Sequence, residues 1–561
     1  MIGKRPGKGL RDRVETLTQS DSVLARRSAL ESECRKGYVI GRTVSVTAGL
    51  ETSTPEYAPL TYRMHDREES DMSDDSSLLK IAQASLITGS ATITVSVLSL
   101  AKSKTIALLQ GTDGIGLLGQ FTSFQSLLGG IAALGLSLGL IKYVSQHFQA
   151  GDHAQVRRFW SSAVTLTIVS SIVVMASMLI FAGPVSRVLV GNDSGVLYVR
   201  IVSLSVPLFA LSTLYNGLIN GARAIKSLAA MAVTGALGSL VIAAPAVYYL
   251  GKDGVIAQLA LSALALVFIN FVVARRVFGR WQVSAKVADF GRREAGMLLK
   301  FGMFSLTTTL LIPAVMLFTQ TFVIKTEGVS ENGLFQAAWA LFWLYIGFAT
   351  ASFSTYIFPT MSATESVGDL TRQVDNSLRF LTVMTTPVSC AIVLFPTQIL
   401  GILYTSEFSG AATLLQILAI ATCFRVLSLP MAFAYVAKGH LKEYLLFEVS
   451  WHAIFMGIVV AALAQTGIVV IGVATLTAYA VYSALAMALG RRIVGVRYSS
   501  RNMMSFALSL TVLVITLAAY LMVDYSAIPI GVAGIAMWFL ATTRREERQW
   551  LKSHVLRLGK G

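Results

Sequence analysis

The sequence is poor in charge, in cysteine and in the residue patterns that bind metals. Only 14% of its 561 residues are Asp, Glu, Lys or Arg, whereas a soluble globular protein carries about 25%. Its cysteines, Cys34, Cys390 and Cys423, are scattered, and its six histidines form no HExxH or CxxC-type pattern. We therefore expect no disulfide framework, no metal and no cofactor. The shortage of charge also excludes a soluble enzyme and a nucleic-acid partner, in spite of a pI of 9.8.

Apolar residues are abundant instead. They make up 54% of the chain, and the mean hydropathy is +0.65, values typical of a multi-pass helical membrane protein. Crossing a bilayer takes about 20 apolar residues, and such segments recur to the C-terminus. The sequence predicts an all-α polytopic protein with fourteen transmembrane segments, at 81–100, 117–141, 159–182, 197–220, 227–250, 255–274, 301–324, 334–358, 377–400, 411–437, 444–465, 468–490, 503–523 and 526–542.

The first 77 residues differ from the rest, being polar and rich in Ser, Thr, Arg and Glu. This composition predicts a disordered cytoplasmic tail, and no apolar signal-peptide core follows the basic start. The alternative is that the natural start is Met72, which opens a short lead-in to the first apolar segment. Both alternatives stay open.

The basic residues orient the segments. With the N-terminus inside, 27 of the 34 Lys and Arg after residue 77 fall on the cytoplasmic side, six fall outside, and Arg425 lies within a span. Cytoplasmic loops of membrane proteins carry such an excess. We therefore predict a multi-pass protein of the bacterial inner membrane with both termini in the cytoplasm.

The chain also repeats itself at an offset of 217 residues. Gly116-Leu117 matches Gly333-Leu334, Gly151-Asp152 matches Gly368-Asp369, and the region holds nine identities in 37 ungapped positions. Each half holds six predicted spans, and the two halves have the same orientation in the membrane. The sequence therefore predicts two bundles related by a parallel repeat, an architecture that occurs in transporters. The predicted divisions are a six-helix bundle at 78–275, a basic cytoplasmic linker at 276–300, a second bundle at 301–492, an extra helix pair at 493–543 and a basic cytoplasmic tail at 544–561.

Four segments carry a family resemblance: GIGLLGQF at 114–121, IKYVSQ at 141–146, ATASFSTYIFPT at 349–360 and YVAKGHLKEYLLFEVS at 435–450. Together they resemble lipid-linked oligosaccharide flippases, the O-antigen and enterobacterial common antigen branch of the multidrug/oligosaccharidyl-lipid/polysaccharide exporter superfamily. The resemblance covers roughly 79–492. The chain departs from the pattern in its tail, in its last helix pair and at Gln320, where some relatives carry an arginine.

The resemblance implies a V-shaped fold that flips an undecaprenyl-diphosphate-linked glycan from the cytoplasmic to the periplasmic leaflet by alternating access, for surface polysaccharide synthesis. It also implies the partners: the lipid-linked oligosaccharide, membrane lipids, a polysaccharide polymerase and a chain-length regulator.

Cations are the candidate substrate-binding residues, because a diphosphate crossing the membrane needs fixed positive charge. Arg425 is the first candidate, about 20 Å from the inner end of its span; a structural ion pair is the alternative role. Lys325 and Arg200, near the outer interface, are further candidates, although their position favours the alternative role of snorkelling anchors. Lys142 ends the second span, where the charge rule alone explains a lysine; the resemblance adds a contact with the entering diphosphate.

Glu448 and His452 are four residues apart and therefore share one helical face. The pair is a candidate for carrying a coupling proton, with interhelical hydrogen bonding as the alternative. Pro313 interrupts the first helix of the second bundle, and we expect a hinge there, although a static bend is the other outcome that prolines produce.

Two other functions compete with flipping. A cation-coupled multidrug exporter of the same superfamily is the alternative, but the first six spans lack a mid-helix Asp or Glu to bind organic cations. A membrane glycosyl- or phosphotransferase would need paired carboxylates, or a nucleophile and a base, near one face. The short outer loops offer neither, so we expect a transporter and not an enzyme.

Overall fold

The computed structural model describes residues 74–282, 289–352, 357–523 and 528–542. Within these ranges every regular element is a helix, as predicted. Expectations for the polar tail up to residue 73 with Met72, for linker residues 283–288 and for the basic tail from 543 lie outside the described residues. The long helices are α2 (Asp74–Ala132), α3 (Leu136–Gln149), α4 (His153–Ile180), α6 (Val196–Gly221), α7 (Ile225–Gln282), α8 (Arg292–Thr326), α9 (Val329–Ser352), α11 (Val367–Leu394), α13 (Ala412–Ala437), α14 (Leu441–Thr466), α15 (Val469–Ile493), α16 (Ser500–Val523) and α17 (Ile528–Thr542); the short ones are α5 (Ala182–Leu189), η1 (Asp193–Gly195), α10 (Phe358–Ala363), α12 (Pro396–Leu403) and η4 (Ser406–Ala411).

Ten helices of the described ranges are long and apolar enough to cross a membrane. Two of them, α2 and α7, are double, because Gly111 and Gly251 each have a φ of 59° that interrupts the helical backbone. Only glycine adopts this left-handed conformation without a steric cost. Each break divides one helix into two of the predicted segments. The count of fourteen spans stays a prediction.

Local signals in the sequence explain where two of the helices begin. Asp152 precedes α4 and its carboxylate accepts a hydrogen bond from the backbone N–H of Gln155 at 3.1 Å. Ser366 precedes α11 and accepts from the N–H of Asp369 at 3.4 Å. Each side chain satisfies a backbone donor that the first turn of the helix leaves free.

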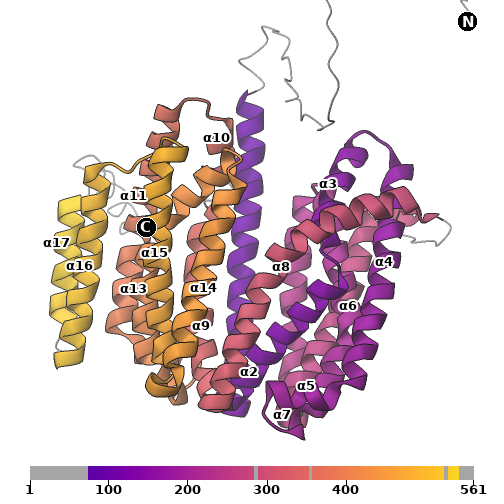
Figure 1. The fold of residues 1–561 in the computed structure, drawn as a ribbon, viewed down its shortest axis with the longest axis horizontal. Coiled ribbons are helices and arrows are strands. Elements are labelled where there is room, and N and C mark those ends of the chain that lie inside the picture. The colour runs from indigo at the N-terminus through magenta and orange to yellow at the C-terminus, as the bar shows by residue number, and fades with distance from the viewer. Residues whose placement is uncertain (1–73, 283–288, 353–356, 524–527, 543–561) are drawn as a thin grey trace, which may run out of the picture. The chain divides into compact units, whose positions relative to one another are not determined.

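Helix α8 crosses from the first half of the chain to the second (Figure 1). Near its start, Leu298 packs in a buried cluster of first-half residues around Trp160 and Leu214. After Pro313, its Met316 and Val323 pack in a large cluster formed mainly by second-half residues. Pro313 therefore lies between the two packing regions of one helix, which is where a hinge between the halves would act.

The two glycines that the repeat aligns meet where α2 crosses α9. A Cβ on Gly116 would lie 2.2 Å from the Val329 carbonyl oxygen, and one on Gly333 would lie 2.0 Å from the Thr112 carbonyl oxygen. Val329 is the repeat counterpart of Thr112, so the crossing is symmetric under the repeat. Asn332 also donates to the Gly116 carbonyl at 2.8 Å, and the hydroxyls of Thr112 and Ser330 are 2.5 Å apart. The crossing thus joins the two halves by close backbone contact.

The last two helices pack together beside α11 at one edge of the described structure (Figure 1). Thr386 of α11 donates to the Ser509 hydroxyl of α16 at 3.1 Å, and the buried Trp538 of α17 donates its indole N–H to the Ser505 carbonyl at 3.3 Å. These contacts hold α16 and α17 against the second half.

Candidate functional site

Arg425 lies in the middle of α13, whose surroundings are aromatic. Its guanidinium lies 5.3 Å from the ring centroid of Tyr479 on α15, a cation–π arrangement. Its Nε is buried and has no hydrogen-bond partner among the described residues. A buried guanidinium N–H without a partner is costly, and an acceptor brought to this N–H would remove that cost.

Glu448 and His452 are held on α14 by different contacts. The His452 Nδ1 is 2.7 Å from the backbone carbonyl of Glu448, and because a carbonyl only accepts, Nδ1 carries the hydrogen. The Tyr482 hydroxyl donates to Glu448 Oε1 at 3.2 Å. The glutamate side chain is thereby tied to α15, while His452 is tied to the backbone of its own helix.

These three residues meet in one cavity. A space of about 330 Å³ has Arg425, Glu448 and His452 in its wall. A neighbouring space of about 270 Å³ shares Arg425, Glu448, Thr350, Tyr444 and Tyr482 with it. We call the two spaces together the Arg425 cavity. The remaining residues of its wall are Ile312, Met316, Trp339, Trp343, Leu429, Ala432, Phe433, Val436, Trp451 and Tyr479.

The Arg425 cavity joins a cation, a carboxylate and several hydroxyl groups on an aromatic wall. Trp451 stacks on Phe455 with ring centroids 5.1 Å apart, and its buried indole N–H has no partner among the described residues. Free donors from a guanidinium and an indole, beside tyrosine hydroxyls, suit a ligand with phosphate and sugar oxygens. Arg425 of α13 lies in the same wall as Glu448 of α14, an arrangement that their spacing in the sequence does not reveal.

The other predicted cations lie elsewhere. Lys142 is exposed on α3, with its Nζ 5.4 Å from the Tyr143 ring and 5.2 Å from the Phe301 ring. Lys325 in the last turn of α8 and Arg200 in the first turns of α6 are also exposed. None of the three is among the described residues that line the Arg425 cavity. Their substrate-binding role stays a prediction.

Gln320, where some relatives carry an arginine, is buried in α8. Its amide donates to the Gln336 side chain of α9 at 2.9 Å. It does not belong to the wall of the Arg425 cavity as the structure describes it. At this position the chain has a packing hydrogen bond in place of a cavity cation.

A second polar cavity, of about 690 Å³, lies among α2, α3, α6 and α7 and was missed by the sequence analysis. Lys102 lines it; we call it the Lys102 cavity. The predicted first span ended at residue 100, which placed Lys102 in an outer connection. The structure differs at this boundary, because α2 continues as a helix past Lys102 to the break at Gly111. The apolar run after Lys104 and the Gly111-Thr-Asp turn signal could have revealed it.

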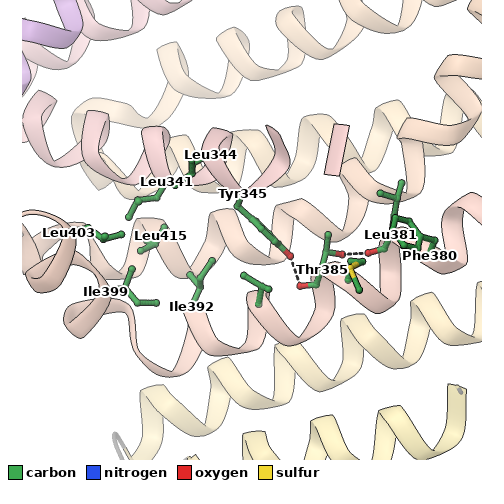
Figure 2. A pocket seen from close by; sticks show the side chains of 12 residues that line it. Leu341, Leu344, Tyr345, Phe380, Leu381, Thr385, Ile392, Ile399, Leu403 and Leu415 are labelled. Atoms are coloured by element: carbon green, nitrogen blue, oxygen red, sulfur yellow. Dashed lines mark hydrogen bonds between the residues drawn. The ribbon is translucent and has the colours of Figure 1, made fainter. Parts of the chain in front are cut away.

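A third cavity, of about 540 Å³, is apolar (Figure 2). Leucine and isoleucine side chains from α9, α11, α12 and α13 form most of its wall. Its principal polar group, the Tyr345 hydroxyl, already donates to the Thr385 carbonyl and lies 3.0 Å from the Ser389 hydroxyl. This cavity suits hydrocarbon and offers no free charge to a diphosphate.

Comparison with known proteins identifies the family. Residues 108–413 match a protein family whose description is "polysaccharide biosynthesis protein". The chain belongs to this family. The match confirms the resemblance drawn from the sequence motifs.

The chain is similar to one curated protein in sequence and to two solved structures in fold. The chain is 27% identical over 379 residues to the lipid III flippase of Escherichia coli (strain K12), covering 67% of this chain and 90% of that protein. The solved structure of lipid II flippase MurJ in an inward closed conformation is similar with a TM-score of 0.64 at 12% identity, over 82% of this chain and 98% of that one. An inward-facing multidrug resistance MATE family transporter gives 0.62 at 16% identity, over 73% and 98%. The two structures confirm the predicted fold class.

Proposed function

We propose that the protein flips an undecaprenyl-diphosphate-linked oligosaccharide from the cytoplasmic to the periplasmic leaflet by alternating access, for surface polysaccharide synthesis. The observation that carries the proposal is Arg425, a partly buried cation whose buried Nε–H is unpartnered among the described residues, in a cavity of tyrosines and tryptophans. The relative named lipid III flippase supports the substrate class. The cargo is moved and not altered, so the proposal needs no enzymatic step.

Different residues of the second half would bind different parts of the substrate. The Arg425 guanidinium is a planar fork that holds phosphate oxygens in pairs, and the hydroxyls of Tyr444 and Tyr482 provide neutral partners for sugars. Glu448 in the same cavity repels the diphosphate while it is ionised and stops repelling it when it is protonated. A change in the protonation of Glu448 would therefore change how tightly the cavity holds the diphosphate, which would make flipping depend on the pH gradient.

A reconstitution assay tests the function. Purified protein in proteoliposomes should move an undecaprenyl-diphosphate glycan, fluorescently labelled on its sugar, to the opposite leaflet, where an impermeant lectin or quencher detects it. Liposomes without protein are the control. Retention of the labelled glycan in its original leaflet at every pH gradient and membrane potential would refute flipping.

A cation-coupled multidrug exporter is the second candidate, favoured by the Glu448 carboxylate in the cavity. The same proteoliposomes, loaded with a lipophilic cationic dye, distinguish the two candidates. We expect no protein-dependent dye movement, because Arg425 repels a cation in the same cavity.

We also propose that both termini lie in the cytoplasm of a bacterium and that the protein resides in the inner membrane. A single cysteine placed at Arg497 should react with an impermeant thiol reagent only from inside, and one at Asn192 or Gly328 only from outside. The reversed pattern at either position would overturn the orientation.

A polysaccharide polymerase and a chain-length regulator are the proposed partners, since they act on glycans delivered to the outer leaflet.

The coupling proposal predicts the behaviour of Glu448→Gln. The amide keeps the hydrogen bond from Tyr482 but cannot release a proton, so flipping should lose its dependence on an imposed pH gradient while substrate binding remains. Flipping rates at several gradients, together with a binding isotherm, measure both. Glu443→Gln, on the same helix but outside the cavity wall, is the matched control. An unchanged gradient dependence in Glu448→Gln would leave the pair with a packing role.

A further inference from the structure

The Lys102 cavity lies apart from the Arg425 cavity and has a different wall. Nine of its nineteen lining residues are polar, and all of them come from α2, α3, α6 and α7. The Arg425 cavity is lined by residues of α8 and later helices. At about 690 Å³ the Lys102 cavity falls within the range of about 300–1,000 Å³ that is typical of small-molecule sites.

Lys102 is a partly buried ammonium whose described partner is neutral. Its Nζ donates to the Ser239 hydroxyl of α7 at 3.3 Å, a long hydrogen bond that leaves two of its three hydrogens for other acceptors. No Asp or Glu is among the described residues that line the cavity. Because a buried charge is costly unless it is paired, this arrangement calls for an anion from outside the chain.

The other polar groups of the wall suit a sugar. Asn216 and Asn220 are four residues apart on α6, so they lie on one helical face, and both are exposed where they line the cavity. Neither amide has a side-chain hydrogen bond to another residue that the structure describes. An amide offers both donors and an acceptor to adjacent sugar hydroxyls, and the Phe209 ring in the same wall offers an apolar face.

We infer that the Lys102 cavity binds an acidic sugar of the transported glycan, with Lys102 pairing the sugar carboxylate and Asn216 and Asn220 binding its hydroxyls. The inference rests on the proposed function and adds to it the class of glycan. One cation, Arg425, then serves the diphosphate, and a second cation in a separate cavity serves a carboxylate on the glycan. The substrate is accordingly a lipid-linked oligosaccharide that contains a uronic acid.

Two probes that differ at one carbon test the inference. They are undecaprenyl-diphosphate-linked oligosaccharides that carry either a uronic acid or the corresponding neutral hexose, and their affinities for the purified full-length protein are compared. We expect the wild type to bind the acidic probe at least about tenfold more tightly, since only the acidic probe forms a charge-assisted hydrogen bond with Lys102. Lys102→Met should remove this preference and leave the affinity for the neutral probe unchanged. Lys102→Arg should keep part of it.

A control variant shows whether the effect is specific to Lys102, and the possible negative results can be told apart. Lys226→Met removes an exposed lysine of the same half that does not line the cavity, and it should bind both probes as the wild type does. Equal affinity of the wild type for the two probes, or a preference that survives in Lys102→Met, overturns the inference while flipping stands. A wild type that binds neither probe overturns the proposed function itself. Loss of the preference when phosphatidylglycerol is added would assign Lys102 to a lipid headgroup instead.

Discussion

Replacing Arg425 by alanine should nearly abolish flipping, by about tenfold or more, in well-expressed protein. The guanidinium is the cation of the Arg425 cavity, and its buried Nε has no other described partner. Loss of a charge-assisted hydrogen bond removes about 1.5–3 kcal/mol of interaction with the diphosphate. Arg425→Lys should restore only part of the rate, because an ammonium keeps the charge but not the planar fork that holds phosphate bidentately.

Expression must be measured with activity, since a structural role predicts a different outcome. An arginine needed only for folding would lower the amount of protein in the membrane, whereas a substrate-binding arginine lowers the rate per molecule. Arg501→Ala, which removes an exposed arginine in the first turn of α16, is the matched control and should flip normally. Normal flipping by well-expressed Arg425→Ala would refute the proposal and direct attention to Lys142 and Lys325.

The symmetric crossing of α2 and α9 predicts a second large effect. The hydroxyls of Thr112 and Ser330 are 2.5 Å apart across the two halves, so cysteines at both positions should form a disulfide under oxidation. Alternating access requires the halves to separate at one end and then at the other. The oxidised Thr112→Cys/Ser330→Cys protein should therefore lose nearly all flipping, and dithiothreitol should restore it.

The disulfide experiment has its own controls. The single variants, treated with the same oxidant, should retain activity, because each lacks a partner thiol at the crossing. The native Cys390 and Cys423 are buried and free, and Cys34 is replaced by serine to remove a competing thiol. Mass spectrometry quantifies the cross-link. Complete cross-linking with an undiminished flipping rate would show that this contact stays closed throughout the transport cycle.

Much of the architecture could be predicted from the sequence, because hydrophobic length and charge are local properties. About 20 apolar residues suffice to predict a membrane helix, and the match of Gly116 with Gly333 was visible as a sequence repeat. Its physical reason was not visible. Only the tertiary structure shows that each glycine lies where a Cβ would collide with a backbone carbonyl of the other half. Small residues allow such close helix crossings.

The site was predictable residue by residue but not as an arrangement. Arg425 was identified because a charge inside an apolar span is costly and needs a reason, and Glu448 and His452 because spacing of four residues places them on one face. That Arg425 and Glu448 share a cavity depends on how α13 and α14 pack beside α15, which involves contacts between residues distant in sequence. The helix that carries Lys102 extends beyond the predicted apolar segment to the break at Gly111. Hydropathy alone does not mark where such a helix ends. The sequence thus predicted that Arg425, Glu448 and His452 lie within apolar spans, because hydropathy is local, and the tertiary packing decided that they meet.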